Sequence, residues 1–108
     1  MGSLLYGSSS TKIAFDDRAL AHLQIVITAK LRRREGFVLS WTNSTVDGSG
    51  RGAIWLDPSS TIYFRYDGSR SPNINREWIN ILAISSNAPA GLIFTLEPPA
   101  TEVLPSRP

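Results

Sequence analysis

The alternation of apolar and polar positions changes its period along the chain. Two short strand-like runs, Ser3–Tyr6 and Lys12–Phe15, flank the turn-forming residues 7–10, which predicts an opening β-hairpin. A helical period follows, in which large apolar side chains recur every three or four residues, at Leu20, Leu23, Ile27 and Leu31. The chain is therefore expected to pass from the hairpin into a helix that ends before Gly36.

A period of two returns after this helix and predicts three strands. The first has an apolar face of Phe37, Leu39 and Trp41, and the second, Arg51–Leu56, follows a glycine-rich stretch. Residues 57–60 then turn the chain into a third strand, whose apolar face is Ile62, Phe64 and Tyr66. The three strands are expected to form a meander.

The last third of the chain predicts a second helix and a final strand. The helix has an apolar stripe of Ile74, Trp78, Ile81 and Leu82, and the strand that follows has Leu92, Phe94 and Leu96. The order ββαβββαβ predicts an α+β fold, a two-layer sandwich in which two helices cover one face of a largely antiparallel sheet. The other sheet face is expected to carry Ser40, Thr42, Tyr63, Arg65, Ile93 and Thr95.

Composition fits one folded domain with a tail. The chain has 108 residues, of which 42% are hydrophobic and 19% charged, as is ordinary for a globular protein. Four of its seven prolines fall within residues 98–108. We therefore expect a single α+β domain over residues 1–97 and a proline-rich flexible tail over 98–108.

Catalytic groups are scarce. The chain has no cysteine and one histidine, His22, so neither a thiolate nucleophile nor a cysteine-based zinc site is available. His22 is expected to be a solvated helix residue, and the adjacent Asp16 and Asp17 to cap the helix rather than to act as paired acids. No secretion signal or membrane span is apparent. We expect a cytoplasmic protein that is not an enzyme and binds no cofactor, metal or membrane.

Two glycine-containing segments are candidate anion sites. Residues 47–52, which include Arg51, superficially resemble a phosphate cradle but join two predicted strands, as a hairpin turn does. Residues 67–70 repeat this pattern just before a predicted helix, where Arg70, Asn73 and Arg76 lie close in sequence. Either Arg70 and Arg76 fork onto a phosphate, or Arg70 pairs with Asp67 or Glu77 while Ser71 or Asn73 caps the helix.

Basic residues also mark the end of the first helix. Arg32, Arg33 and Arg34 are suited to contact a nucleic-acid backbone, although they equally stabilise a helix C-terminus. Aromatic stacking on bases would need exposed rings, and Trp41 and Tyr66 fall on the predicted core face. The candidate binding residues are therefore Arg32, Arg33, Arg34, Arg51, Arg70, Asn73 and Arg76.

Several motifs carry a resemblance to a known family. They are Met1-Gly2-x-Leu4-x-Tyr6-Gly7, Asp16-Asp17-Arg18-x-Leu20-Ala21-His22-Leu23, Lys30-Leu31-Arg32-Arg33, Phe37-x-x-Ser40-Trp41, Gly48-x-Gly50-Arg51-x-x-Ile54-Trp55, Gly68-Ser69-Arg70-x-Pro72 and Asn75-Arg76-x-Trp78-Ile79. Across residues 1–98 the chain resembles a family of short, uncharacterised actinobacterial proteins often labelled ATP-dependent DNA ligase. Such a ligase needs a Lys-x-Asp-Gly motif, which neither Lys12 nor Lys30 provides. No ligase activity is expected.

Two functional hypotheses follow. The first is a non-catalytic binding or interaction module, a homodimer that holds a partner on the exposed sheet face or on residues 70–76. The alternative is a nucleic-acid-binding accessory domain associated with DNA ligation or repair, without ligase activity of its own. Clustering of the candidate arginines on one surface would favour the alternative.

Overall fold

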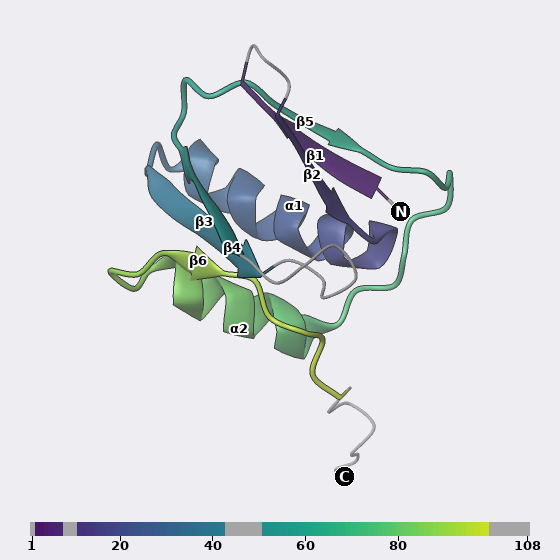
Figure 1. Cartoon of the computed structure of the whole chain (residues 1–108). Coiled ribbons are helices and arrows are strands. Elements are labelled where there is room, and N and C mark those ends of the chain that lie inside the picture. The colour runs from purple at the N-terminus through teal and green to yellow at the C-terminus, as the bar shows by residue number, and fades with distance from the viewer. Residues whose placement is uncertain (1, 8–10, 43–50, 100–108) are drawn as a thin grey trace, which may run out of the picture.

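Strands and helices follow one another in the predicted order ββαβββαβ (Figure 1). The computed structural model describes residues 2–7, 11–42 and 51–99; residues 8–10 of the predicted turn, 47–50 of the glycine-rich segment and 100–108 of the predicted tail lie outside them. The helices are α1 (Asp17–Arg32) and α2 (Arg76–Ser86). The strands are β1 (Gly2–Tyr6), β2 (Thr11–Phe15), β3 (Phe37–Thr42), β4 (Arg51–Leu56), β5 (Ile62–Arg65) and β6 (Leu92–Ile93).

The described strands divide between two three-stranded sheets. The first sheet has the order β2-β1-β5 and is antiparallel throughout. The second has the order β4-β3-β6, with β4 antiparallel and β6 parallel to β3. The predicted meander is wrong at β5, which pairs with β1 (Leu4 opposite Phe64) instead of β4. The α+β class and the mostly antiparallel pairing are confirmed, with two small sheets in place of one.

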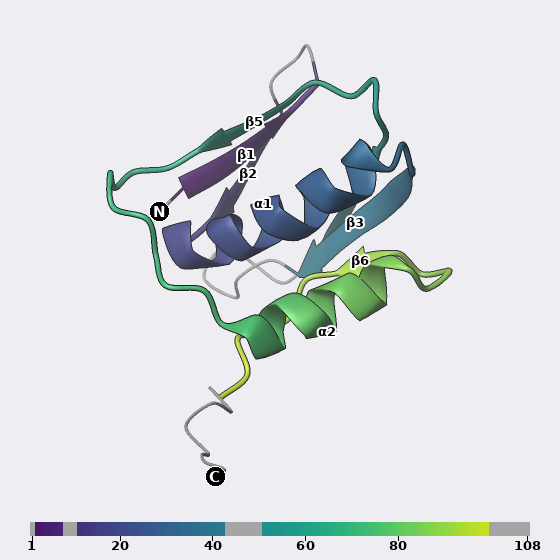
Figure 2. The same cartoon turned by 180° about the vertical axis from the view of Figure 1, so that it is seen from behind.

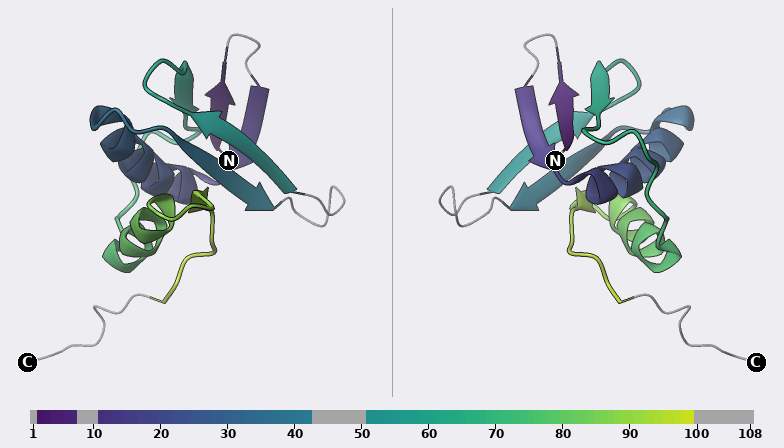
Figure 3. Two further views of the ribbon diagram at one scale, coloured as in Figure 1. Left: turned by 90° about the vertical axis from the view of Figure 1, so that its left-hand side faces the viewer. Right: turned by 90° about the vertical axis from the view of Figure 1, so that its right-hand side faces the viewer.

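Both helices lie on the same side of the strands, as predicted (Figure 3). Helix α1 packs against β1 and against α2, and α2 packs against β6 and β3 (Figure 2). A single apolar core fills the space between these elements: Leu4, Ile13, Phe15, Ala19, Leu20, Leu23, Val26, Ile27, Phe37, Leu39, Leu56, Trp78, Leu82 and Leu92. The hydroxyl of Tyr6 on β1 donates to the carbonyl of Trp55 on β4 and so ties the two sheets together.

The core confirms most of the apolar stripes. Leu20, Leu23 and Ile27 are fully buried, and burial of each such side chain contributes about 1.5–3 kcal/mol. Trp41 and Tyr66 are partly buried against the core, as the alternation predicts. Two other aromatic residues of the strands, Trp55 and Tyr63, are exposed by 52% and 58%.

Side-chain caps fix where the helices begin. Asp16 accepts a hydrogen bond from the backbone N–H of Ala19 at 2.7 Å, so it is the N-cap of α1. The N-cap of α2 is Asn75, whose side-chain oxygen accepts from the N–H groups of Glu77 and Trp78. The expectation that Ser71 or Asn73 caps this helix is therefore wrong, because the helix starts later in the chain.

Candidate ligand-binding groove

A groove of about 610 Å³ lies between the outer face of α1 and the connection from β5 to α2. Helix α1 contributes Ala21, Gln24, Ile25, Thr28, Ala29 and Arg32, and the connection contributes Tyr66, Ile74 and residues 68–72. The connection descends from β5 past the start of α1 to α2 (Figure 2). The volume falls within the range of small-molecule sites, about 300–1,000 Å³.

The first end of the connection is fastened to α1 by Asp17. Its carboxylate accepts hydrogen bonds from the backbone N–H groups of Gly68 at 2.8 Å and of Asp67 at 3.2 Å. These bonds favour the charged form and lower the pKa of the Asp17 carboxyl. Two turns further along α1, Gln24 accepts a hydrogen bond from the Tyr66 hydroxyl at 2.5 Å. Asp17 therefore positions the groove wall instead of sharing the capping role of Asp16.

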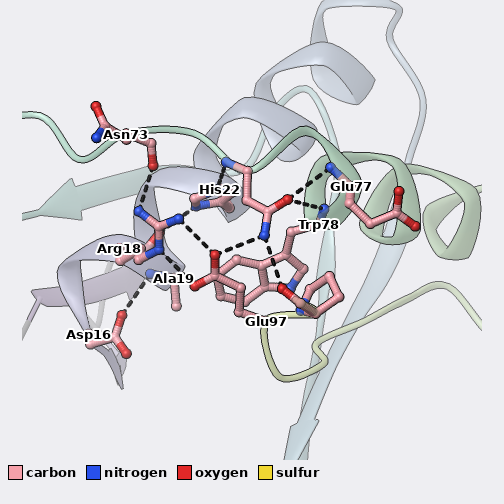
Figure 4. Close-up of polar contacts among 10 residues, drawn as sticks. Asp16, Arg18, Ala19, His22, Asn73, Glu77, Trp78 and Glu97 are labelled. Atoms are coloured by element: carbon pink, nitrogen blue, oxygen red, sulfur yellow. Dashed lines mark hydrogen bonds and ion pairs between the residues drawn. The ribbon is translucent and has the colours of Figure 1, made fainter. Parts of the chain in front are cut away.

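The second end of the connection is fastened by Arg18 (Figure 4). One amino group of its guanidinium donates to the carbonyl of Asn73 at 2.7 Å, while its other nitrogens hold both carboxylate oxygens of Glu97, each at 2.7 Å. The side-chain amide of Asn75 also donates to Glu97, at 2.9 Å, and to the carbonyl of Pro98, at 3.1 Å. The bonds from Arg18 and then Asn75 lower the pKa of Glu97 from 4.5 to about 2.

His22 completes this fastening and is fully buried (Figure 4). Its Nδ1 lies 2.7 Å from the carbonyl oxygen of Arg18, and its Nε2 accepts a hydrogen bond from the backbone N–H of Asn75 at 2.8 Å. A carbonyl only accepts, so Nδ1 carries the proton and the ring is neutral with both nitrogens occupied. The ring also lies 4.6 Å from that of Trp78. The expectation of a solvated histidine is therefore wrong, and His22 positions the chain before α2.

Two of the predicted binding residues meet in the groove. Arg32 lines it from α1 and Arg70 from the connection. Neither makes an ion pair with any residue that the structure describes, so the expected pairing of Arg70 with Asp67 or Glu77 is not observed there.

The other predicted binding residues do not share this site. Arg33 pairs with Glu35 at 3.3 Å, and Arg34 adopts a left-handed conformation, with φ of 61°, just after the end of α1. Arg51 lines a separate hollow at the second sheet. Asn73 contributes its backbone carbonyl to Arg18, and Arg76 begins α2 outside the groove. The described arginines are therefore dispersed over several surfaces.

The pattern of the sequence does not predict the apolar part of the groove. Ile25 and Ile74 line it and remain 42% and 43% exposed. The predicted apolar stripe of the second helix includes Ile74, but α2 starts two residues after it. A usable signal was present at Ile25, which is large and apolar yet falls outside the stripe of Leu20, Leu23 and Ile27.

Within residues 2–7, 11–42 and 51–99, no group of three or more acidic or histidine side chains is placed to hold a metal ion. Over the same residues, neither helix combines the length and apolar character that crossing a membrane requires. The chain is thus a small α+β domain in which one helix and one fastened connection form the two walls of a groove.

The chain belongs to the family described as "Domain of unknown function (DUF7882)", whose model matches residues 1–97. No curated protein and no solved structure matches it.

Proposed function

We propose that this domain is a non-catalytic binding module and that the groove between α1 and the β5–α2 connection holds its ligand. The observation that supports it most is the double fastening of the groove wall, by Asp17 at one end and by Arg18 and His22 at the other. A wall fixed in advance loses little conformational entropy when a ligand binds. Both ring nitrogens of His22, the one histidine of the chain, are engaged in hydrogen bonds that hold the groove wall. This supports a binding role over acid–base chemistry.

A neutral fluorescent dye, Nile red, tests whether the groove binds apolar groups. We expect the full chain to bind the dye, with chemical-shift changes at the amides of Ala21, Ile25 and Ala29. The variant Ile25→Glu places a charge in the groove and should abolish binding. Ile84→Glu is the matched control, because Ile84 is 72% exposed on α2 and does not line the groove. Equal loss in both variants, or no binding by the unaltered chain, would refute the proposal.

A second candidate function, single-stranded nucleic-acid binding, is favoured by the outer face of the first sheet. Tyr63 and Lys12 both lie opposite Leu5 and so project from one face, together with Arg65 two residues after Tyr63. Tyr63 is 58% exposed. An exposed ring beside two cations suits a stacked base and its phosphates.

Fluorescence anisotropy with labelled single-stranded DNA, at low and at moderate salt, tests this second candidate. We expect binding that weakens with salt and that falls in Tyr63→Ala. Trp55→Ala, which removes an exposed ring from the second sheet, is the control and should bind as the unaltered chain does. Absence of binding at low salt would exclude the candidate.

A further inference from the structure

The floor of the groove is apolar and only half covered. Ala21, Ile25 and Ala29 lie on successive turns of one face of α1, and Pro72 and Ile74 face them from the connection. The two isoleucines each leave more than two fifths of their surface in water. A bound apolar group would cover this surface, and each buried methylene would contribute about 0.8 kcal/mol.

The charges of the groove have one sign. Arg32 and Arg70 line it, and no aspartate or glutamate does. Arg32 has no ion-pair partner among the described residues, whereas Arg18 is paired with Glu97, and Lys30 and Arg33 are paired with Glu35. The two groove arginines therefore keep their donors for an anion, and a guanidinium binds carboxylate and phosphate groups through parallel hydrogen bonds.

Beyond the proposed binding role, on which this inference rests, we infer that the ligand of the groove is an amphiphilic anion. Its apolar body lies on Ala21, Ile25, Ala29 and Ile74, and its carboxylate or phosphate head is held by Arg32 or Arg70. The face of α1 from residue 21 to residue 32 spans roughly 16 Å at the helical rise per residue, which suits an extended chain. The guanidinium groups donate charge-assisted hydrogen bonds, so Arg32 and Arg70 are the strongest donors for the head among the residues that line the groove.

Three probes of ten carbons each separate the contribution of the head from that of the body: decanoate, decyl phosphate and decanol. Each is titrated into the isotope-labelled full chain below its micelle concentration, and its affinity is taken from the amide shifts of Ala21, Ile25 and Ala29. We expect the better of the two anions to bind about tenfold or more tightly than decanol, as charge-assisted hydrogen bonds imply. The anion that binds more tightly identifies the head group.

The double variant Arg32→Gln/Arg70→Gln should bring the affinity for the anions down to that for decanol and leave decanol binding within about twofold. The control Arg33→Gln/Arg76→Gln removes the same charge outside the groove and should keep the preference for anions. Equal binding of decanol and both anions would overturn the inference while the proposed function stood. Loss of the preference in the control as well would also overturn it, and no binding of any probe would refute both.

Discussion

Substitution of Glu97 by glutamine should destabilise the domain at neutral pH and remove part of its acid sensitivity. Arg18 and Asn75 lower the pKa of Glu97 from 4.5 to about 2. A shift of this size corresponds to about 3 kcal/mol at 1.36 kcal/mol per pH unit. The Arg18 and Glu97 side chains are 40% and 30% exposed, so screening by solvent reduces the expected contribution to about 1 kcal/mol.

The sign of the pH dependence follows from the direction of the shift. A carboxyl group whose pKa is lowered by folding stabilises the folded state above its unfolded pKa, and this contribution is lost as the pH falls through the folded value. The difference in unfolding free energy between the unaltered chain and Glu97→Gln should therefore be constant near neutral pH, shrink below pH 4.5 and vanish near pH 2.

Urea unfolding followed by far-ultraviolet circular dichroism at several pH values measures this difference directly. Glu77→Gln is the control, because Glu77 lies in the first turn of α2 and its carboxylate takes no part in the contacts of Arg18. A difference for Glu97→Gln that stayed constant down to pH 2, or that grew with acid, would refute the assigned role of the Arg18–Glu97 pair.

Three further predictions concern the parts that hold the groove and the second sheet in place. His22→Leu leaves the buried N–H of Asn75 without its acceptor and should lower the unfolding free energy by about 1–3 kcal/mol in urea; an unchanged value would contradict the structural role of the ring. Asn75→Ala removes the cap of α2 and should cost about 1 kcal/mol, and Asn75→Asp should not restore it, because its carboxylate would face that of Glu97 where the amide donates a hydrogen bond. Gly91 has φ of 86°, and an added Cβ would lie 2.5 Å from the carbonyl oxygen of Val38, so Gly91→Ala should lower the melting temperature by several degrees. Retention of the full melting temperature would show that the second sheet adjusts at β3.

Elements set by local pattern were predictable from the sequence. The stripe of Leu20, Leu23 and Ile27 located α1, and alternation placed Trp41 on the core side of β3. The strand with which β5 pairs was not predictable. Both β1 and β4 have an apolar face, so the apolar face of β5 continues equally well beside either strand. Strands that are consecutive in sequence usually pair, which favoured β4 as the partner of β5, but β5 pairs with β1.

The groove was only partly predictable for a similar reason. Arg32 and Arg70 are among the seven predicted binding residues, but nothing local indicates that a helix end and a distant connection line one groove. The Arg18–Glu97 pair joins residues 79 positions apart, beyond any local signal. His22 did leave a trace, because it continues the spacing of Ala19 and Val26 on the buried face of α1. A lone polar residue on such a face is better assigned to the core with partners than to solvent.

The guanidinium of Arg18 binds the carbonyl of Asn73, in one wall of the groove, and the carboxylate of Glu97, the last residue that the family model matches. A change that strengthens one of these two contacts alters the free energy of the other, and the coupling is the same in both directions. Under the proposed function, a force on the chain after Glu97 would weaken the contact of Arg18 with Asn73 and so loosen the wall of the groove. Under the proposed function, a ligand held in the groove would in turn oppose separation of Glu97 from Arg18.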